Sequence, residues 1–338
     1  MQHKQIDVIQ VLRGYGALSV FISHFLGDYD NVFHFTGQLG VAVFFLISGF
    51  LLIYTTDNMK KDFFIKRLIR IVPLYYFMTL VVALIGLVYP GLLHTSKITL
   101  LNILKSLFFI PNRLEGTELI QPILPVGWTL YSEIFVYLIF YLFFRIFSSN
   151  IGAGISTATV LSFLVCINTC LNSNNVFLNI YGGLYILYYV VGILFAICYK
   201  KYSIREVKIK NASIWDGICI IGFLVFLIME NYYHISVITV LITSCMFCLI
   251  VFLGAKTSFN NCFTFVGKIS FSFYLCHYFV IKAFSRLLPF NKNLVVVVIL
   301  YFMGSLGLTI FASLILHKLF EEKVPKLLKR VIEGKQNG

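Results

Sequence analysis

The stretch VLRGYGALSVFISHFLG, residues 11–27, is apolar enough to cross a membrane, yet it contains Arg13 and His24. An α-helix turns about 100° per residue, so side chains eleven residues apart lie on one face, roughly 16 Å apart along the axis. A charged arginine inside a bilayer costs about 3 kcal/mol or more, and ionisable residues there usually have a function. The pair therefore predicts a buried helix face with a fixed cation and a titratable imidazole. The alternative is structural: Arg13 reaches the membrane surface and His24 only packs.

Apolar segments recur along the whole chain. Of its 338 residues, 59% are hydrophobic and 12% are charged, about half the charged fraction typical of soluble domains. We predict an all-α polytopic bundle of transmembrane helices, a single domain over residues 1–338 with no appended soluble domain. Ten spans are expected, at residues 9–27, 37–56, 71–90, 127–147, 151–171, 178–199, 214–229, 235–253, 268–289 and 293–317.

The net charge of +13 comes from Lys and Arg residues concentrated in alternate loops. This asymmetry predicts that both termini are cytoplasmic and that the number of spans is even. Because the basic residues gather on no soluble face, nucleic acid is not an expected partner. All eight cysteines fall in or beside apolar segments, so we expect neither a metal site nor a disulfide framework. The chain also lacks a P-loop, which argues against an ATP-driven pump.

Two further ionisable residues fall within predicted spans. Glu133 ends the segment GWTLYSE, where a carboxylate either holds a proton or pairs with a cation. Its structural alternative is a buried partner of an arginine such as Arg13. His277 ends the segment GKISFSFYLCH and shares a helix face with Tyr274. A hydrogen-bonded packing histidine is the structural alternative there.

Basic residues precede the third predicted span in FFIKRLIRIVPLYY, residues 63–76. Arg67 and Arg70 are three apart and share a helix face, so with Lys66 nearby they can clamp a phosphate or diphosphate. The alternative is topology-setting charge against anionic lipid. Further on, KITLLNILKSLFFI, residues 97–110, has helical apolar spacing. It either lies in the outer interface, dips into the membrane, or forms a surface loop helix.

Six elements in order resemble the acyltransferase-3 family of integral membrane O-acyltransferases. They are RGYGALSVFISH, GVAVFFLISGFLL, RLIR followed by Pro73, GWTLYSE, GKISFSFYLCH and EEKVP. The resemblance covers the whole length of the chain. It implies that Arg13 and His24 form the acyl-transfer site and that Arg67 and Arg70 handle acyl-coenzyme A. Glu133 and His277 match positions in recurring family motifs.

The resemblance implies transfer of an acyl group, expected to be acetyl, from acyl-coenzyme A to a hydroxyl of a carbohydrate. The acceptor is expected to be lipid-linked or at the cell surface, such as lipopolysaccharide O-antigen or exopolysaccharide. Acetyl-coenzyme A is expected as a co-substrate, and no permanently bound cofactor is expected. Membrane lipid is a further expected partner. The protein is expected in the bacterial inner membrane.

We expect His24, Arg13 and Glu133 to be catalytic, and Arg67, Arg70, Lys66 and Arg13 to bind the donor. His24 acts either as general base or as a transient acyl carrier, with Asp28 or Asp30 orienting its ring.

Two rival functions remain open. The first is a membrane exporter of small organic acids, because an intramembrane arginine can bind a carboxylate and a His/Glu pair can relay protons. The second is a catalytically silent scaffold, in which the polar residues only pair helices.

Overall fold

The structure is a computed structural model that describes residues 7–27, 37–56, 62–89, 98–113, 120–147, 149–172, 174–201, 221–222, 225, 229, 234–254, 261–287 and 295–334. It is 88% helix. Apart from an isolated bridge between Arg113 and Ile120, these residues contain no strand. The predicted all-α class is confirmed.

Six helices are long and apolar enough to cross a membrane, so the protein is a multi-pass membrane protein. They are Asp7–Gly27, Phe63–Val88, Pro125–Phe147, Asn150–Leu171, Val176–Lys201 and Val296–Leu328. A pair of helices bent by 87°, Cys262–Lys268 and Ser270–Arg286, gives up to 7 spans, and Gln38–Tyr54 and Val237–Phe252 are shorter apolar helices. The number ten and the cytoplasmic termini stay predictions, and most of the predicted span 214–229 lies outside the described residues.

The chain divides into two compact units. The first comprises Met1–Met59 and Phe135–Ser270, and the second comprises Lys60–Ile134 and Phe271–Gly338. The division falls within helix α5, Trp128–Phe147, and at the start of helix α12, Ser270–Leu287.

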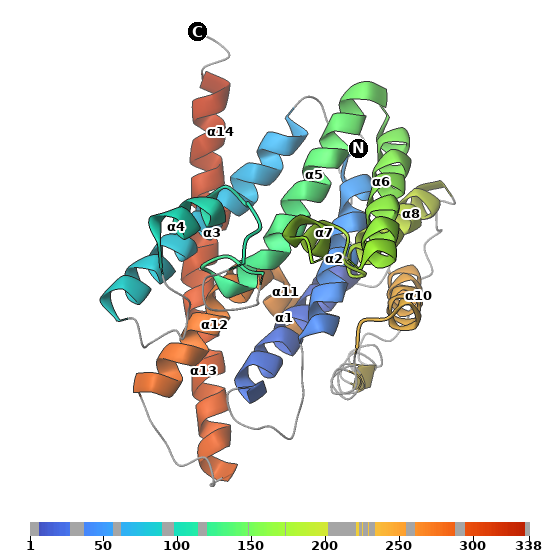
Figure 1. Cartoon of the computed structure of the whole chain (residues 1–338). Coiled ribbons are helices and arrows are strands. Elements are labelled where there is room, and N and C mark those ends of the chain that lie inside the picture. The colour runs from blue at the N-terminus through green and yellow to red at the C-terminus, as the bar shows by residue number, and fades with distance from the viewer. Residues whose placement is uncertain are drawn as a thin grey trace. The chain divides into compact units, whose positions relative to one another are not determined.

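In the first unit, α1 packs against α2 and α11, and α8 packs against α2 and α6 (Figure 1). The helices of this unit are α1 (Asp7–Gly27), α2 (Gln38–Tyr54), α6 (Asn150–Leu171), α7 (Val176–Tyr181), α8 (Ile186–Lys201), α10 (Val237–Gly254) and α11 (Cys262–Lys268). Glycines let these backbones approach closely. A Cβ on Gly14 would lie 2.1 Å from the carbonyl oxygen of Phe263, and one on Gly267 would lie 1.9 Å from that of Gln10. Small residues at such contacts are typical of helix packing in membranes.

The second unit contains α3, α4, the 3₁₀ turn η1, the start of α5, α12, α13, η2 and α14. Their bounds are α3 (Phe63–Val88), α4 (Leu100–Leu107), η1 (Pro125–Gly127), α13 (Val295–Leu316), η2 (His317–Lys323) and α14 (Val324–Gly334). Helix α13 continues through η2 into α14 as one rod, orange to red in Figure 1. The η2 segment is a π-helix, a form that occurs mostly in single turns and frequently at functional sites.

Helix α4 turns its polar side inward. Leu100 and Leu101 are 72% and 59% exposed, whereas Asn102 and Ser106 are buried. A helix at the surface of a soluble protein does the reverse, because water favours the polar face. Of the alternatives for residues 97–110, this arrangement favours a segment that faces lipid over a plain surface loop helix.

Candidate functional site

Arg13 and His24 lie on one unbroken helix, as predicted. Both side chains are half-buried on α1. This helix has the most buried window among the candidate spans, with 72% of it inside the protein. Its ionisable side chains therefore lie on a helix surrounded mainly by other helices rather than by lipid.

The residues around Arg13 hold α1 tightly against its neighbours. A Cβ on Gly40 of α2 would lie 2.6 Å from the carbonyl oxygen of Gly16, so these two backbones are in contact. The Tyr15 ring meets the Phe263 ring of α11 edge-on, with 4.4 Å between centroids. Together with Gly14 against Phe263, these contacts fix the position of the backbone from which the arginine projects.

A second polar centre joins the start of α5 to α12. The Tyr274 hydroxyl donates to the carbonyl oxygen of Val126 at 2.9 Å and lies 3.1 Å from the Thr129 hydroxyl. Glu133 interacts electrostatically with the same tyrosine. Tyr274 is 8% exposed, so these groups satisfy one another away from water. The structure thus brings Glu133 and the polar face of α12 together.

His277 is fully buried one turn further along α12. Its Nδ1 lies 2.7 Å from the carbonyl oxygen of Tyr274 and 3.3 Å from that of Phe273. A carbonyl only accepts, so this contact requires the proton on Nδ1 and makes Nε2 the acceptor atom of the neutral ring. The hydrogen-bonded histidine of the structural alternative is thus present beside Tyr274.

The basic residues lie at the beginning of α3. Lys66 is half-exposed and pairs with Asp62 at 3.7 Å, which offsets part of its charge. Arg67 and Arg70 are less exposed, and the Arg67 guanidinium lies 5.4 Å from the centre of the Phe63 ring. The first turn of a helix also carries a partial positive charge, which favours an anion there. Of the three cations, the two arginines are better suited to hold a phosphate.

The structure thus places the predicted residues in both units. Arg13 and His24 belong to the first unit, and Lys66, Arg67, Arg70, Glu133 and His277 belong to the second. Asp28 and Asp30 lie outside the described residues. In the part of the chain that the structure describes, no three His, Cys, Asp or Glu side chains are grouped to hold a metal ion.

Sequence reasoning missed a buried polar network between α3 and α4. The Tyr75 hydroxyl donates to the carbonyl oxygen of Ser106 at 2.9 Å, and the Ser106 hydroxyl accepts from the backbone N–H of Ile123 at 3.0 Å. Asn112 donates through Nδ2 to Oδ1 of Asn102 at 3.3 Å. The available signal was Asn102 and Ser106, four residues apart within an otherwise apolar segment. This network anchors α4 through its polar face.

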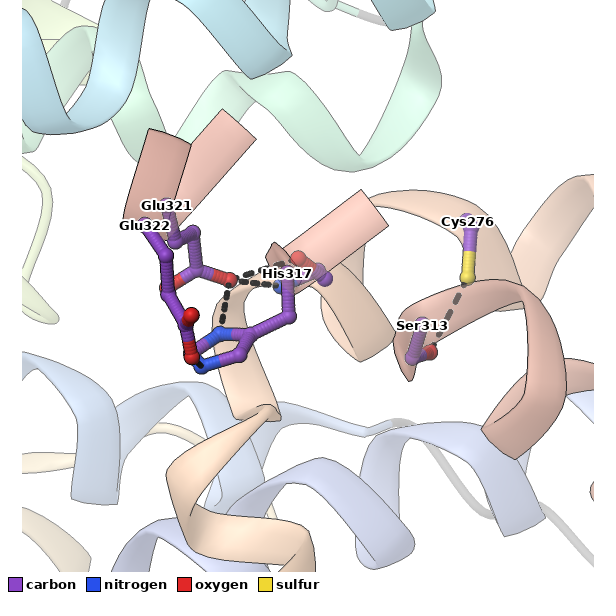
Figure 2. Close-up of polar contacts among 6 residues, drawn as sticks. Cys276, Ser313, His317, Glu321 and Glu322 are labelled. Atoms are coloured by element: carbon purple, nitrogen blue, oxygen red, sulfur yellow. Dashed lines mark hydrogen bonds and ion pairs between the residues drawn. The ribbon is translucent and has the colours of Figure 1, made fainter. Parts of the chain in front are cut away.

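A second missed cluster lies in η2, and a further polar contact joins α12 to α13. Figure 2 shows the Glu321 carboxylate turned toward the His317 imidazole, with Glu322 also beside the ring. Elsewhere in the same view, the Cys276 thiol meets the Ser313 hydroxyl at 3.3 Å. The signal was His317 at the end of the last predicted span, four residues before the first glutamate of EEKVP.

Changing Tyr274 to Phe should destabilise the protein. The change removes the donor to Val126 and the contact with Thr129, and an unmade buried hydrogen bond costs about 1–3 kcal/mol. The thermal unfolding midpoint in detergent measures the effect. Tyr76→Phe is the control in the same unit, because the Tyr76 ring is only half-buried and lies against the Phe109 ring. Equal shifts in both variants would contradict the assigned role of the Tyr274 hydroxyl.

Comparison with known proteins identifies the family. The sequence profile of the acyltransferase domain family, Acyl_transf_3, matches residues 6–318. The exopolysaccharide production protein ExoZ of Rhizobium meliloti (strain 1021) is 40% identical over 111 residues, which are 32% of this chain and 34% of ExoZ. The match thus spans about a third of the length of that relative. No solved structure matches this chain significantly. Because the family profile covers nearly the whole chain, the protein belongs to the acyltransferase-3 family.

Proposed function

We propose that the protein transfers an acyl group, acetyl in the simplest case, from acyl-coenzyme A to a hydroxyl of a lipid-linked or polymeric carbohydrate. The observation that carries the proposal is the Arg13/His24 pair on α1, the helix with the most buried window, in a chain of an acyltransferase family. The relative named for exopolysaccharide production supports an exopolysaccharide unit as acceptor. The bacterial inner membrane gives such an enzyme access to a cytoplasmic donor and a membrane-bound glycan.

The donor is held through its phosphates. Arg67 and Arg70 are the fifth and eighth residues of α3 and lie on one helix face, where their two guanidinium groups favour an anion. Within the first unit, Arg13 and His24 lie on the same helix, so Arg13 can bind an anionic or polar part of the donor arm while the thioester lies at His24. The separation of roughly 16 Å along α1 suits a long, narrow arm better than a compact substrate.

The chemistry needs one proton carrier. His24 removes the proton of the sugar hydroxyl as its oxygen attacks the thioester carbonyl carbon. The carbon–sulfur bond then breaks, and the imidazolium returns the proton to the departing thiolate. In the other mechanism, His24 itself attacks the thioester carbonyl carbon, the carbon–sulfur bond breaks and coenzyme A leaves as its thiolate. The sugar hydroxyl then attacks the acyl-imidazole, which frees the His24 nitrogen, and the hydroxyl proton ends on the released thiolate. Glu133 is kept as a proposed catalytic residue and His277 as a further candidate, both within the second unit.

The direct test uses the purified full-length protein with labelled acetyl-coenzyme A, with and without a lipid-linked glycan. Transfer of label to the glycan is the expected result. In proteoliposomes, movement of a small organic acid without any acylation would instead identify an exporter and overturn the proposal.

Changing Arg67 and Arg70 together to Ala should weaken donor binding. Each charge-assisted hydrogen bond contributes about 1.5–3 kcal/mol, so we expect the Kd for coenzyme A to rise by about tenfold or more. Calorimetry at several salt concentrations measures the Kd and should also show a weaker salt dependence. Lys66→Ala is the matched control and should change the Kd only slightly, because Lys66 is exposed and paired with Asp62. An unchanged affinity in the double variant would reject the clamp.

A further inference from the structure

The first turn of α12 is capped by a carboxylate from another helix. Glu321 of η2 accepts two hydrogen bonds through Oε1, from the backbone N–H of Ser272 at 3.2 Å and from its hydroxyl at 2.5 Å. Ser272 is fully buried, and the Glu321 side chain is 8% exposed. The first N–H groups of a helix have no partner within it, and a negative charge there also meets the positive end of the helix dipole. The contact thus gives the Ser272 N–H a hydrogen-bond acceptor, which the apolar side chain of Ile269, just before α12, cannot provide.

The His317 imidazole lies beside this carboxylate and belongs to the same segment. Its Nδ1 lies 3.1 Å from Oε1 of Glu321, and its Nε2 lies 3.5 Å from Oε1 of Glu322 (Figure 2). In an α-helix the fifth residue along is turned about 140° away from the first. The wider turn of a π-helix lets residues four and five positions ahead flank one imidazole. The π-helical form of η2 therefore places Glu321 and Glu322 at the same imidazole.

The η2 segment also contacts α3. The ring of Phe320 lies 4.8 Å from that of Phe77, centroid to centroid. One short segment thus touches both α3, which carries Arg67 and Arg70 near its start, and α12, which carries Tyr274 and His277. Segment η2 therefore links α3 and α12 within the second unit.

We infer that Glu321 is a positioning residue for acyl transfer, acting through Ser272. Its carboxylate holds α12 in the place where the Tyr274 hydroxyl reaches Thr129 and Val126 beside Glu133. The inference rests on the proposed function for its catalytic consequence. Glu322 is the natural comparison, because it approaches the same imidazole but is 51% exposed and has no bond to Ser272 in the described part of the chain.

The kinetic test compares Glu321→Ala, Glu321→Gln, Ser272→Ala and the Ser272→Ala/Glu321→Ala pair, with Glu322→Gln as control. Glu321→Ala should lower kcat about tenfold or more while leaving the KM for the acyl donor within about twofold. Glu321→Gln should recover part of the loss, since an amide oxygen still accepts from Ser272. The double variant should be no worse than Glu321→Ala, because both changes remove one interaction. Two outcomes would overturn the inference. One is a loss of kcat in the double variant equal to the product of the two single losses, and the other is an unchanged kcat in Glu321→Ala.

A second readout does not depend on the reaction. Cys276 on α12 is 3% exposed and hydrogen-bonded to Ser313. N-ethylmaleimide can alkylate this thiol only when the helix opens locally, so the alkylation rate, measured by peptide mass spectrometry, reports local opening of α12. Glu321→Ala should raise the alkylation rate at Cys276 at least about tenfold, whereas Glu322→Gln should not change it. If the wild-type protein fails to acylate a glycan, the proposed function fails, and the alkylation rates alone decide the positioning role. Equal rates in wild type and Glu321→Ala would overturn it.

Discussion

Replacement of His24 by Ala is expected to abolish acyl transfer while leaving the protein folded in the membrane. Removing a positioned proton carrier typically lowers a rate by about 10²–10⁴-fold. The loss should be at least as large if His24 carries the acyl group, because no other imidazole lies on α1. The measurement is the rate of label transfer from acetyl-coenzyme A to a glycan acceptor, at equal amounts of monodisperse protein.

Ser23→Ala is the matched control for this variant. Ser23 is buried beside His24 on the same helix, and its hydroxyl donates only to the carbonyl oxygen of Val20 one turn back, at 3.0 Å. Its loss should leave activity within about twofold of wild type, because such local bonds add little to a helix. Release of coenzyme A in the absence of acceptor separates the two mechanisms, since only an acyl carrier releases it in a burst. Full activity in His24→Ala would end the assignment of this residue.

Changing Gly267 to Val is expected to cause the largest loss of stability. Its Cβ would lie 1.9 Å from the carbonyl oxygen of Gln10, so α11 must move away from α1. Overpacking of a tight core costs typically 1–3 kcal/mol, and we expect about 3 kcal/mol here because backbone meets backbone. Since α1 carries Arg13, activity should fall together with the thermal unfolding midpoint.

Gly307→Val serves as the control for the same chemical change. Among the described residues, no atom outside its own helix backbone lies within 4 Å of a Cβ at Gly307, and this residue also lies inside a helix, α13. Valine there replaces the more flexible glycine without a clash, so the unfolding midpoint should stay near that of wild type. Similar losses in both variants would show that helix propensity, rather than the α1–α11 contact, decides the result.

Most of the described helices coincide with predicted spans, but their ends differ, and the number of ten spans stays a prediction. The segment 71–90 was expected as the third span, yet α3 begins at Phe63, because a helix continues past the apolar stretch through Lys66, Arg67 and Arg70. The last span was expected to end at residue 317, yet the helix runs through η2 and α14 to Gly334. Hydropathy measures the length that suits a bilayer, whereas hydrogen bonding along the backbone decides where a helix stops.

In the candidate site, too, local features were predictable from the sequence and contacts between distant residues were not. The spacing of Arg13 and His24 on one helix face is a local property, so it was predictable from residue count alone. The contact of Thr129 with Tyr274 joins residues 145 positions apart, and no periodicity encodes such a pair.

The sequence by itself determined the membrane class, the helices and the ionisable residues placed within them, because these depend on local composition and a helical period of 3.6. Only the tertiary structure decided that α4 buries its asparagine and exposes its leucines. It alone also decided that Glu321 caps α12 from a π-helical segment. Both arise because buried polar groups must find partners, and those partners come from distant parts of the chain that meet only in the folded protein.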